Sequence, residues 1–264
     1  MQSGSILRFV FGSVLALFLN CAIGDDQPYK VVTAPEVKKM REEGKLIVHA
    51  MSRIEYEVQH IPGSVNIPYT DVKLPGKLPA NKTAPIVFYC AAPECYFSRL
   101  AAVQAAEIGY KNIFWFQGGI AEWRKMQYEM EVNKDMIDIE IPMLAPTDFK
   151  SMIEKNPRIY VLDAQPSWTA LEQLQHGEKN PFARKIKQTA ASIPVIELDL
   201  KLAKLPKDRE ILIFDTYMKQ ASIAAKYLKF KGFKVVGILK GGLARWMEEG
   251  YPVVNRVLPA KATP

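Results

Sequence analysis

The sequence predicts an α/β protein built from two repeats of one unit, each a mostly parallel sheet flanked by helices in three layers.

 
Two observations carry this prediction. Short apolar stretches alternate with helical ones along most of the 264 residues, which is typical of a parallel sheet with crossover helices. In addition, residues 84–130 have a counterpart at 209–253 when the apolar run 86–90 is aligned with 211–215. We therefore interpret the chain as a tandem duplication.

Three landmarks recur at matching places in the two copies: a glycine followed by an aromatic residue, a Gly-Gly pair, and a tryptophan four residues after the second glycine of that pair. They are Gly109-Tyr110, Gly118-Gly119 and Trp123 in the first copy, and Gly232-Phe233, Gly241-Gly242 and Trp246 in the second. The repeated tryptophans are typical of core anchors rather than ligand platforms.

In the first copy the apolar runs predict strands and the periodic stretches predict helices. The expected strands are 46–50, 86–89 and 113–116, and the expected helices are 34–44, 98–109 and 118–128. The first two of these helices end at a glycine, a residue favoured just after the last helical turn.

Residues 1–24 have the features of a secretory signal peptide. Arg8 precedes an apolar run at 9–19 that is too short to cross a membrane comfortably, and the small residues Ala22 and Gly24 flank Ile23 before the expected cleavage point. The alternative is a lipoprotein signal in which Cys21 carries the lipid, although "FLNC" matches that pattern poorly. We expect an exported, periplasmic protein, attached to a membrane only if Cys21 is lipidated.

The remaining chain divides into a first domain at 25–132, a linker at 133–147, a second domain at 148–256 and a tail at 257–264. Prolines bracket the linker, and the tail is expected to fray.

The formal net charge is +7, from 35 Lys and Arg against 28 Asp and Glu. The basic residues are scattered among acidic and apolar ones, whereas a nucleic-acid-binding protein would concentrate them in a stripe or a known module. The sequence therefore predicts no nucleic-acid partner, while attraction of small anions stays open.

The first copy resembles the rhodanese-like domain. The resemblance rests on "EYEVQHIPGSVNIP" at 55–68, a cysteine closing a strand at Cys90, and "GYKNIFWFQGGIAEW" at 109–123. The second copy resembles the same family more weakly: it lacks the His-Ile-Pro-Gly element and has Asp215 where the cysteine would stand. In most tandem proteins of this kind the active copy is the C-terminal one, but here the cysteine lies in the N-terminal copy.

This resemblance implies a sulfurtransferase that carries sulfur as a persulfide on Cys90, with neither metal nor organic cofactor. Its partners would be a small sulfur or related chalcogen donor, such as polysulfide or thiosulfate, and a thiol acceptor. Independently of the family, a loop between a strand and a helix can direct backbone N–H groups and the positive helix end at an anion, which lowers the pKa of a cysteine there. The expected substrate-binding residues follow Cys90 in this loop: Ala91, Ala92, Glu94, Tyr96, Phe97, Ser98 and Arg99.

The loop departs from the family pattern. Gly109 lies nineteen positions after Cys90, whereas Gly232 lies seventeen positions after Asp215, so the loop of the first copy is two residues longer. Pro93 removes an N–H donor and Glu94 disfavours an anionic substrate, so efficient use of thiosulfate is not expected. A phosphatase would need an arginine at the position of Tyr96, so phosphatase activity is not expected from this loop.

The loop also resembles that of a subgroup of exported rhodanese-like proteins with the pattern Cys-x-x-Pro-x-Cys-aromatic, which is "CAAPECY" here. We consider three roles for Cys95: a resolving thiol that attacks the persulfide on Cys90, half of a redox switch that protects Cys90, or a bystander. A soft-metal site is the role that we expect least, because there are only two cysteine ligands and no histidine pattern lies nearby.

Other residues receive structural interpretations. His60 belongs to the turn of the family motif, and Asp215 is interpreted as a remnant because it has no partner carboxylate for acid–base work. His49 and Met51 stand where the family usually has an aspartate and an arginine, and the second copy keeps Asp163 in the place of His49. The second domain is then structural: it covers the first domain's loop and shapes its mouth, or it binds a protein partner.

A different class of function stays open. In this alternative a Cys90–Cys95 disulfide locks the loop, and the chain is a non-catalytic binding or redox-sensing module of an envelope or respiratory assembly. The two hypotheses differ in whether the loop cysteines accept sulfur.

Overall fold

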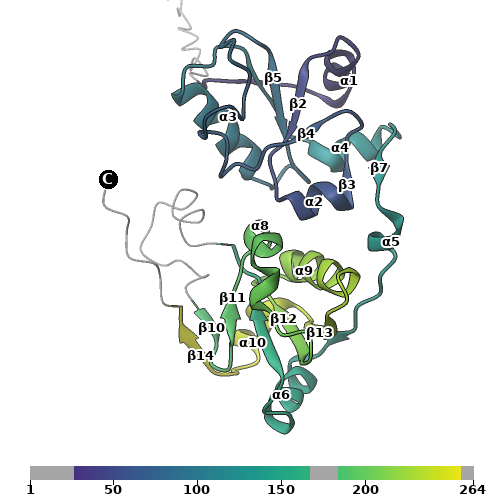
Figure 1. Cartoon of the computed structure of the whole chain (residues 1–264), viewed down its shortest axis with the longest axis vertical. Helices are drawn as coiled ribbons and strands as arrows, with labels where there is room; N and C mark the ends of the chain where they lie inside the picture. The colour runs from purple at the N-terminus through teal and green to yellow at the C-terminus, as the bar shows by residue number, and fades with distance from the viewer. Residues whose placement is uncertain (1–26, 167–183, 257–264) are drawn as a thin grey trace, which may run out of the picture.

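The computed structural model describes residues 27–166 and 184–256. The expected signal segment 1–24, with Cys21, and the expected tail 257–264 lie outside these residues. Two α/β domains lie one above the other and are joined by a connection that runs along one side (Figure 1). No helix in the described ranges is long and apolar enough to cross a membrane.

The first domain has a five-stranded parallel sheet in the order β1-β6-β5-β2-β4. Its strands are β1 (Lys30–Val31), β2 (Leu46–His49), β4 (Val65–Asn66), β5 (Ile86–Tyr89) and β6 (Ile113–Phe116). Its helices are α1 (Ala34–Glu42), α2 (Arg53–Val58), α3 (Phe97–Glu107) and α4 (Gly119–Lys125). The predicted fold class is confirmed, and α4 is shorter than expected because Gln127 adopts a positive φ of 57°.

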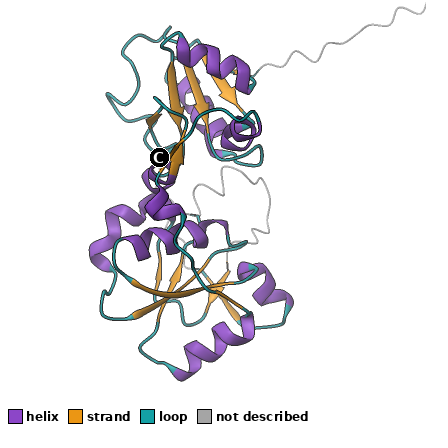
Figure 2. Cartoon of the chain, turned by 90° about the vertical axis from the view of Figure 1, so that its right-hand side faces the viewer, coloured by secondary structure: helices purple, strands orange, loops and turns teal. Residues whose placement is uncertain are grey.

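The central strand β5 is buried on both faces, which explains its unbroken apolar sequence. Ile86 and Phe88 pack in the cluster that α3 covers, while Val87 and Tyr89 pack in the cluster formed with α1 and α4. Helices therefore lie on both faces of the sheet, as Figure 2 shows. This strand directs the residue that follows it, Cys90, to the carboxyl edge of the sheet.

The second domain repeats the arrangement, with the strand order β11-β9-β12-β13-β8. Its strands are β8 (Met143–Leu144), β9 (Tyr160–Asp163), β11 (Ala191–Ser192), β12 (Glu210–Phe214) and β13 (Lys234–Leu239). Its helices are α6 (Pro146–Lys155), α8 (Val195–Leu198), the 3-10 helix η1 (Asp199–Lys204), α9 (Lys219–Phe230) and α10 (Gly242–Glu248). Each strand has its counterpart at the same place in the first sheet, so the predicted duplication is confirmed.

Each domain also has a small antiparallel strand pair. These are β3 (Gln59–His60) with β7 (Glu131–Val132), and β10 (Arg184–Ile186) with β14 (Val253–Asn255).

The connection at 133–147 is integrated into the second domain. It contains α5 (Lys134–Ile137), whose Met136 is buried in that domain's core, and β8, which pairs with β13. The chain therefore joins the second domain's packing before α6 begins.

The two domains share an apolar interface centred on α2. Ile54 of α2 is 0% exposed and packs into the core cluster of the second domain. In return, Ile196 of α8 packs against a core cluster of the first domain. Because each domain completes the other's apolar surface, the second domain covers the loop edge of the first (Figure 1).

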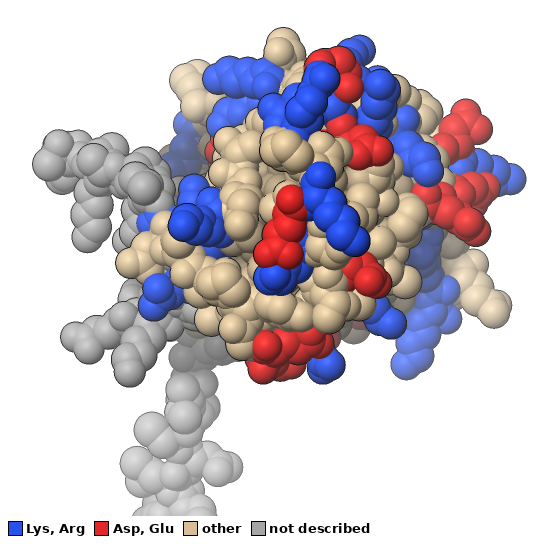
Figure 3. Space-filling model, turned by 90° about the horizontal axis from the view of Figure 1, so that it is seen from below, with Lys and Arg blue, Asp and Glu red and all other residues tan. Residues whose placement is uncertain are grey.

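Basic and acidic side chains are interspersed on the face of the molecule seen from below in Figure 3. On that face the positive charge of the chain is not gathered into a single patch, which is the arrangement expected from the scattered sequence.

Replacing Ile54 with alanine tests the interface. We expect Ile54→Ala to lower the free energy of unfolding by about 2–4 kcal/mol, because it leaves a cavity between the two domains. The measurement is urea unfolding followed by circular dichroism. The matched control Val31→Ala, at a position that is 56% exposed, should change stability by no more than about 0.5 kcal/mol. Equal effects of the two substitutions would contradict a packed interface.

Candidate active site

Cys90 directly follows β5 and is 1% exposed. Its carbonyl oxygen accepts a hydrogen bond from the backbone N–H of Ile120 at 3.0 Å, and that of Ala91 accepts one from Ala121 at 2.9 Å. Gly119 makes this approach possible: its φ is +55°, and a Cβ there would lie 2.3 Å from the carbonyl oxygen of Cys90. The repeated Gly-Gly pair thus fixes the start of the loop against the N-terminal end of α4.

Cys90 and Cys95 form a disulfide, with Cα atoms 6.3 Å apart. The turn between them is closed by a hydrogen bond from the N–H of Cys95 to the carbonyl oxygen of Ala92 at 2.9 Å. The pairing that the sequence left open is therefore present, and it places Cys95 over the buried sulfur of Cys90.

The surroundings of Cys90 Sγ differ from the expected amide cradle. The carbonyl oxygen of Cys95 lies 3.1 Å from this sulfur, and the Ser98 hydroxyl lies 3.2 Å away as a donor. Ser98 itself accepts a hydrogen bond from Trp115 Nε1 at 3.0 Å. No backbone N–H of the described residues donates to Cys90 Sγ in this disulfide form.

A cavity of about 320 Å³ opens between the loop of the first domain and the second domain. Six of the predicted site residues line it: Ala91, Ala92, Glu94, Cys95, Tyr96 and Phe97. The other lining residues are Met51, Glu55, Pro166, Asp215, Thr216, Tyr217, Lys219, Gln220 and Ile223. The second domain therefore supplies one wall of this cavity.

Three predicted residues lie outside this lining. Cys90 and Ser98 are buried behind it, while Arg99 turns toward the N-terminal strand. The Arg99 guanidinium donates to the hydroxyl of Tyr29 at 2.6 Å and to the side chain of Gln27 at 3.4 Å. Arg99, the positively charged residue nearest to the loop in sequence, therefore binds Tyr29 and Gln27 and does not line the cavity.

Glu55 is a cavity residue that sequence reasoning missed. Its carboxylate accepts hydrogen bonds from the hydroxyl and N–H of Ser52, and Gln220 of the second domain donates to it at 3.4 Å. Burial raises the pKa of Glu55, although these hydrogen bonds oppose the shift. The sequence signal, Ser52-x-x-Glu55, is a capping box that predicts only a helix start.

Met51, at the place of the expected arginine, brings a third sulfur to the site. Its Sδ lies 3.5 Å from Cys95 Sγ. This contact is apolar and polarisable rather than charged.

In the second domain, the loop amides converge on the residue that replaces the cysteine. The Asp215 carboxylate accepts hydrogen bonds from the N–H groups of Met218 and of Gln220, the latter at 2.6 Å, at the start of α9. Burial raises the pKa of Asp215, and the amide hydrogen bonds oppose this shift. The side chain of Asp215 thus occupies the anion cradle of its own loop.

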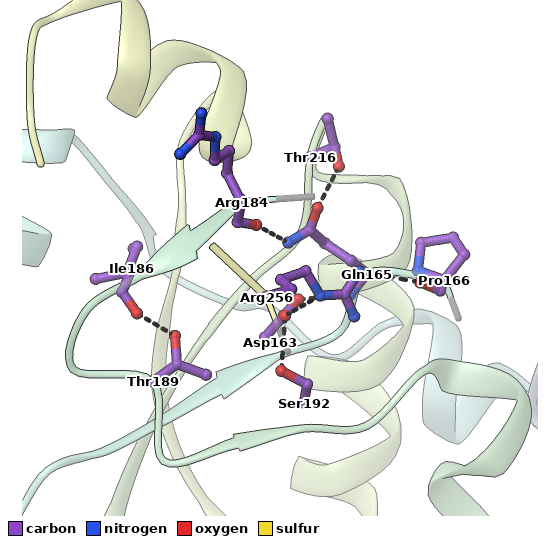
Figure 4. A network of polar contacts seen from close by, with 9 residues as sticks. All are labelled: Asp163, Gln165, Pro166, Arg184, Ile186, Thr189, Ser192, Thr216 and Arg256. Atoms are coloured by element: carbon purple, nitrogen blue, oxygen red, sulfur yellow. Dashed lines mark hydrogen bonds and ion pairs between the residues drawn. The ribbon is translucent and has the colours of Figure 1, made fainter. Parts of the chain in front are cut away.

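The second domain also keeps a buried ion pair between Asp163 and an arginine, shown in Figure 4. Arg256 Nε lies 3.2 Å from Asp163 Oδ2, and the Ser192 hydroxyl donates to the same oxygen at 2.9 Å. Arg256 directly follows β14. The N–H of Gln165 donates to Asp163 Oδ1 at 2.9 Å, while the side chain of Gln165 accepts from the Thr216 hydroxyl and donates to the carbonyl oxygen of Arg184. Burial raises the pKa of Asp163, and Arg256 opposes that shift.

The first domain has His49 in place of this aspartate. His49 is buried, its Nδ1 has no hydrogen-bond partner among the described residues, and its ring contacts the edges or faces of Tyr56 and Tyr89. Burial, with a smaller contribution from His60, lowers the pKa of His49 to about 3. The imidazole is therefore neutral at neutral pH and acts as a packed core residue.

Comparison with known proteins gives matches over both copies. The rhodanese-like domain family matches residues 33–126 and 145–249. A protein described as a sulfurtransferase from Allochromatium vinosum is 29% identical over 65 residues, which is 25% of this chain and 61% of that protein.

Solved structures include a thiosulfate sulfurtransferase from Pseudomonas aeruginosa, 17% identical, with a TM-score of 0.42 over 87% of this chain and 44% of that one. A rhodanese-related protein from Thermoplasma volcanium is 25% identical, with a TM-score of 0.34 over 42% of this chain and 96% of that one. The chain thus spans less than two thirds of the curated relative and of the Pseudomonas structure.

The neutral, buried His49 makes stability depend on pH. The unfolded chain binds a proton at this residue near its usual pKa of 6.5, whereas the folded chain binds one only near pH 3. Stability is therefore lost as the pH falls below 6.5, by about 2 kcal/mol between pH 7 and pH 5 from this residue. We expect His49→Leu to remove that part of the loss, as measured by urea unfolding at the two pH values. The same loss in His49→Leu and the unsubstituted protein would contradict the assignment.

Proposed function

Because the chain belongs to the rhodanese-like domain family, we propose that its first domain is a sulfurtransferase that carries sulfane sulfur as a persulfide on Cys90. The observation that supports this most directly is the placement of Cys90. It lies at the carboxyl edge of the sheet, before the 11-residue helix α3, and directly behind a cavity. The partners would be a sulfur donor and a thiol acceptor.

The cycle begins with reduction of the disulfide. A dithiol reductant attacks the sulfur of Cys95, because Cys95 is partly exposed at the cavity while Cys90 is buried. The Cys90–Cys95 bond breaks as a mixed disulfide forms between the reductant and Cys95, and the electron pair stays on Cys90 as a thiolate. The second thiol of the reductant then displaces Cys95 as a thiolate and leaves the reductant oxidised to a disulfide. The Ser98 hydroxyl, held by Trp115, donates to this sulfur and stabilises the negative charge.

The Cys90 thiolate then attacks the sulfane sulfur of a donor. A new S–S bond forms on Cys90, the donor's bond to that sulfur breaks, and the remainder of the donor leaves with the electron pair. An acceptor thiolate can take the outer sulfur in a second displacement, which returns the Cys90 thiolate.

Cys95 offers a second way out of the persulfide. Its thiolate attacks Cys90 Sγ, the bond to the outer sulfur breaks, and hydrosulfide leaves. The product is the Cys90–Cys95 disulfide seen in the structure, and a dithiol reductant is needed to begin another cycle. In this proposal Cys95 is a resolving thiol, and export of the protein would place the cycle in the periplasm.

One observation favours a second candidate function. The disulfide holds the loop closed with carbonyl oxygens facing Cys90, an arrangement suited to a redox-sensing or binding module rather than to a thiolate. In that case the chain would report on the thiol–disulfide balance of its compartment to a protein partner.

Serine substitutions distinguish the proposed roles of Cys90 and Cys95. After reduction, desalting and incubation with polysulfide, we expect Cys95→Ser to hold one added sulfur on the Cys90 peptide, because the resolving thiol is absent. Cys90→Ser should hold none. The measurement is intact-protein mass spectrometry followed by peptide mapping, with unfolding curves to show that both variants fold. Sulfur retained on Cys90→Ser would contradict the assignment, and no uptake by any reduced form would favour the sensing module.

A further inference from the structure

We propose that the cavity between the two domains selects a sulfane-sulfur donor with an apolar organic body and low charge, and that Tyr217 of the second domain helps to set this preference. The inference rests on the proposed function, since it names the class of donor that Cys90 would use. It assigns a part in substrate choice to the domain that lacks the cysteine.

The walls of the cavity suit an apolar group. Tyr96 from the first domain is 52% exposed and Tyr217 from the second is 60% exposed, and both line the cavity. Met51, Phe97 and Ile223 add further apolar surface. A volume of about 320 Å³ leaves much more room than a small inorganic oxyanion fills, and aromatic walls favour a ring or an alkyl body.

The charged groups of the cavity disfavour a dianion. Three carboxyl groups line it, those of Glu55, Glu94 and Asp215, against the one ammonium group of Lys219 among the described lining residues. Arg99 points elsewhere, toward Tyr29. A donor with two negative charges would face more repulsion than attraction in this setting.

Backbone donors do not compensate for this charge. The carbonyl oxygens of Cys95 and Ala92 lie 3.1 Å and 4.0 Å from Cys90 Sγ, whereas no backbone N–H of the described residues donates to this sulfur. In the second domain the N–H groups of Met218 and Gln220 already bind the Asp215 carboxylate. Neither loop therefore presents a vacant amide cradle to an oxyanion in this structure, so apolar contact remains the main source of donor affinity.

Thiosulfonates provide matched probes. Benzenethiosulfonate and methanethiosulfonate carry the same single charge and differ in the apolar body, whereas thiosulfate carries two charges and has no such body. In each reaction the Cys90 thiolate attacks the sulfane sulfur, the S–S bond of the donor breaks, and a sulfinate, or sulfite from thiosulfate, leaves with the electron pair. Cys90 is left as a persulfide in all three cases.

The experiment measures the second-order rate of persulfide formation with each donor on the reduced full chain carrying Cys95→Ser, because the Cys95 thiol of the unsubstituted chain would remove the added sulfur. We expect benzenethiosulfonate to react at least about tenfold faster than methanethiosulfonate, in the range that a few buried carbon atoms provide, and thiosulfate to react slowest. Tyr217→Ala should lower the benzene-to-methane ratio several-fold. The control Leu200→Ala removes an apolar side chain of the same domain that is 81% exposed and away from the cavity, and it should leave the ratio unchanged.

The outcomes separate the two proposals. If all donors load Cys90 but the benzene and methane donors react equally, or thiosulfate reacts fastest, the donor class is wrong while the sulfurtransferase function stands. If Tyr217→Ala keeps the full ratio, the second domain does not set the preference. If no donor loads reduced Cys90, the proposed function fails and this inference fails with it.

Discussion

The site depends on one contact that both domains repeat: the carbonyl oxygen of the residue after the central strand is held by the first amides of the Gly-Gly helix. In the second domain the N–H of Leu243 donates to the backbone carbonyl oxygen of Asp215 at 2.7 Å. In the first domain the N–H of Ile120 donates in the same way to the backbone carbonyl oxygen of Cys90. Gly242, with a φ of +65°, allows the same close approach as Gly119, because a Cβ there would meet the carbonyl of Thr216 at 2.5 Å. The position of the residue after the central strand is therefore fixed by backbone geometry, whether its side chain is the thiol of Cys90 or the carboxylate of Asp215.

The loop that follows Cys90 and the loop that follows Asp215 present opposite backbone groups to the side chain of that first residue. Asp215 brings its own carboxylate to the amides at the start of α9, so the second loop is complete without a ligand. The longer first loop joins Cys95 to Cys90 and turns carbonyl oxygens toward the sulfur. The second domain thus supplies one wall of the cavity, while the first keeps the cysteine that the proposed sulfur chemistry requires, joined to Cys95.

The parts that were predictable from sequence are those set by local patterns. The strand 86–89 was predicted because it is an unbroken apolar run, and the Gly-Gly repeat identified the duplication. The cavity was not predictable residue by residue, because Glu55 and Gln220 meet only through packing of the two domains. The disulfide stayed open for the same reason: spacing alone does not determine whether two cysteine Cα atoms come close enough to pair.

The interface explains why a domain without the cysteine is still needed by the one that has it. Helix α2 begins beside Met51, buries Ile54 in the second domain and presents Glu55 to the cavity. Without the second domain, Ile54 would face water and Glu55 would lose both its burial and the contact with Gln220. The residues that border Cys95 are then no longer held in place. The second domain therefore acts on the first through α2, by fixing the wall of the cavity in front of the disulfide.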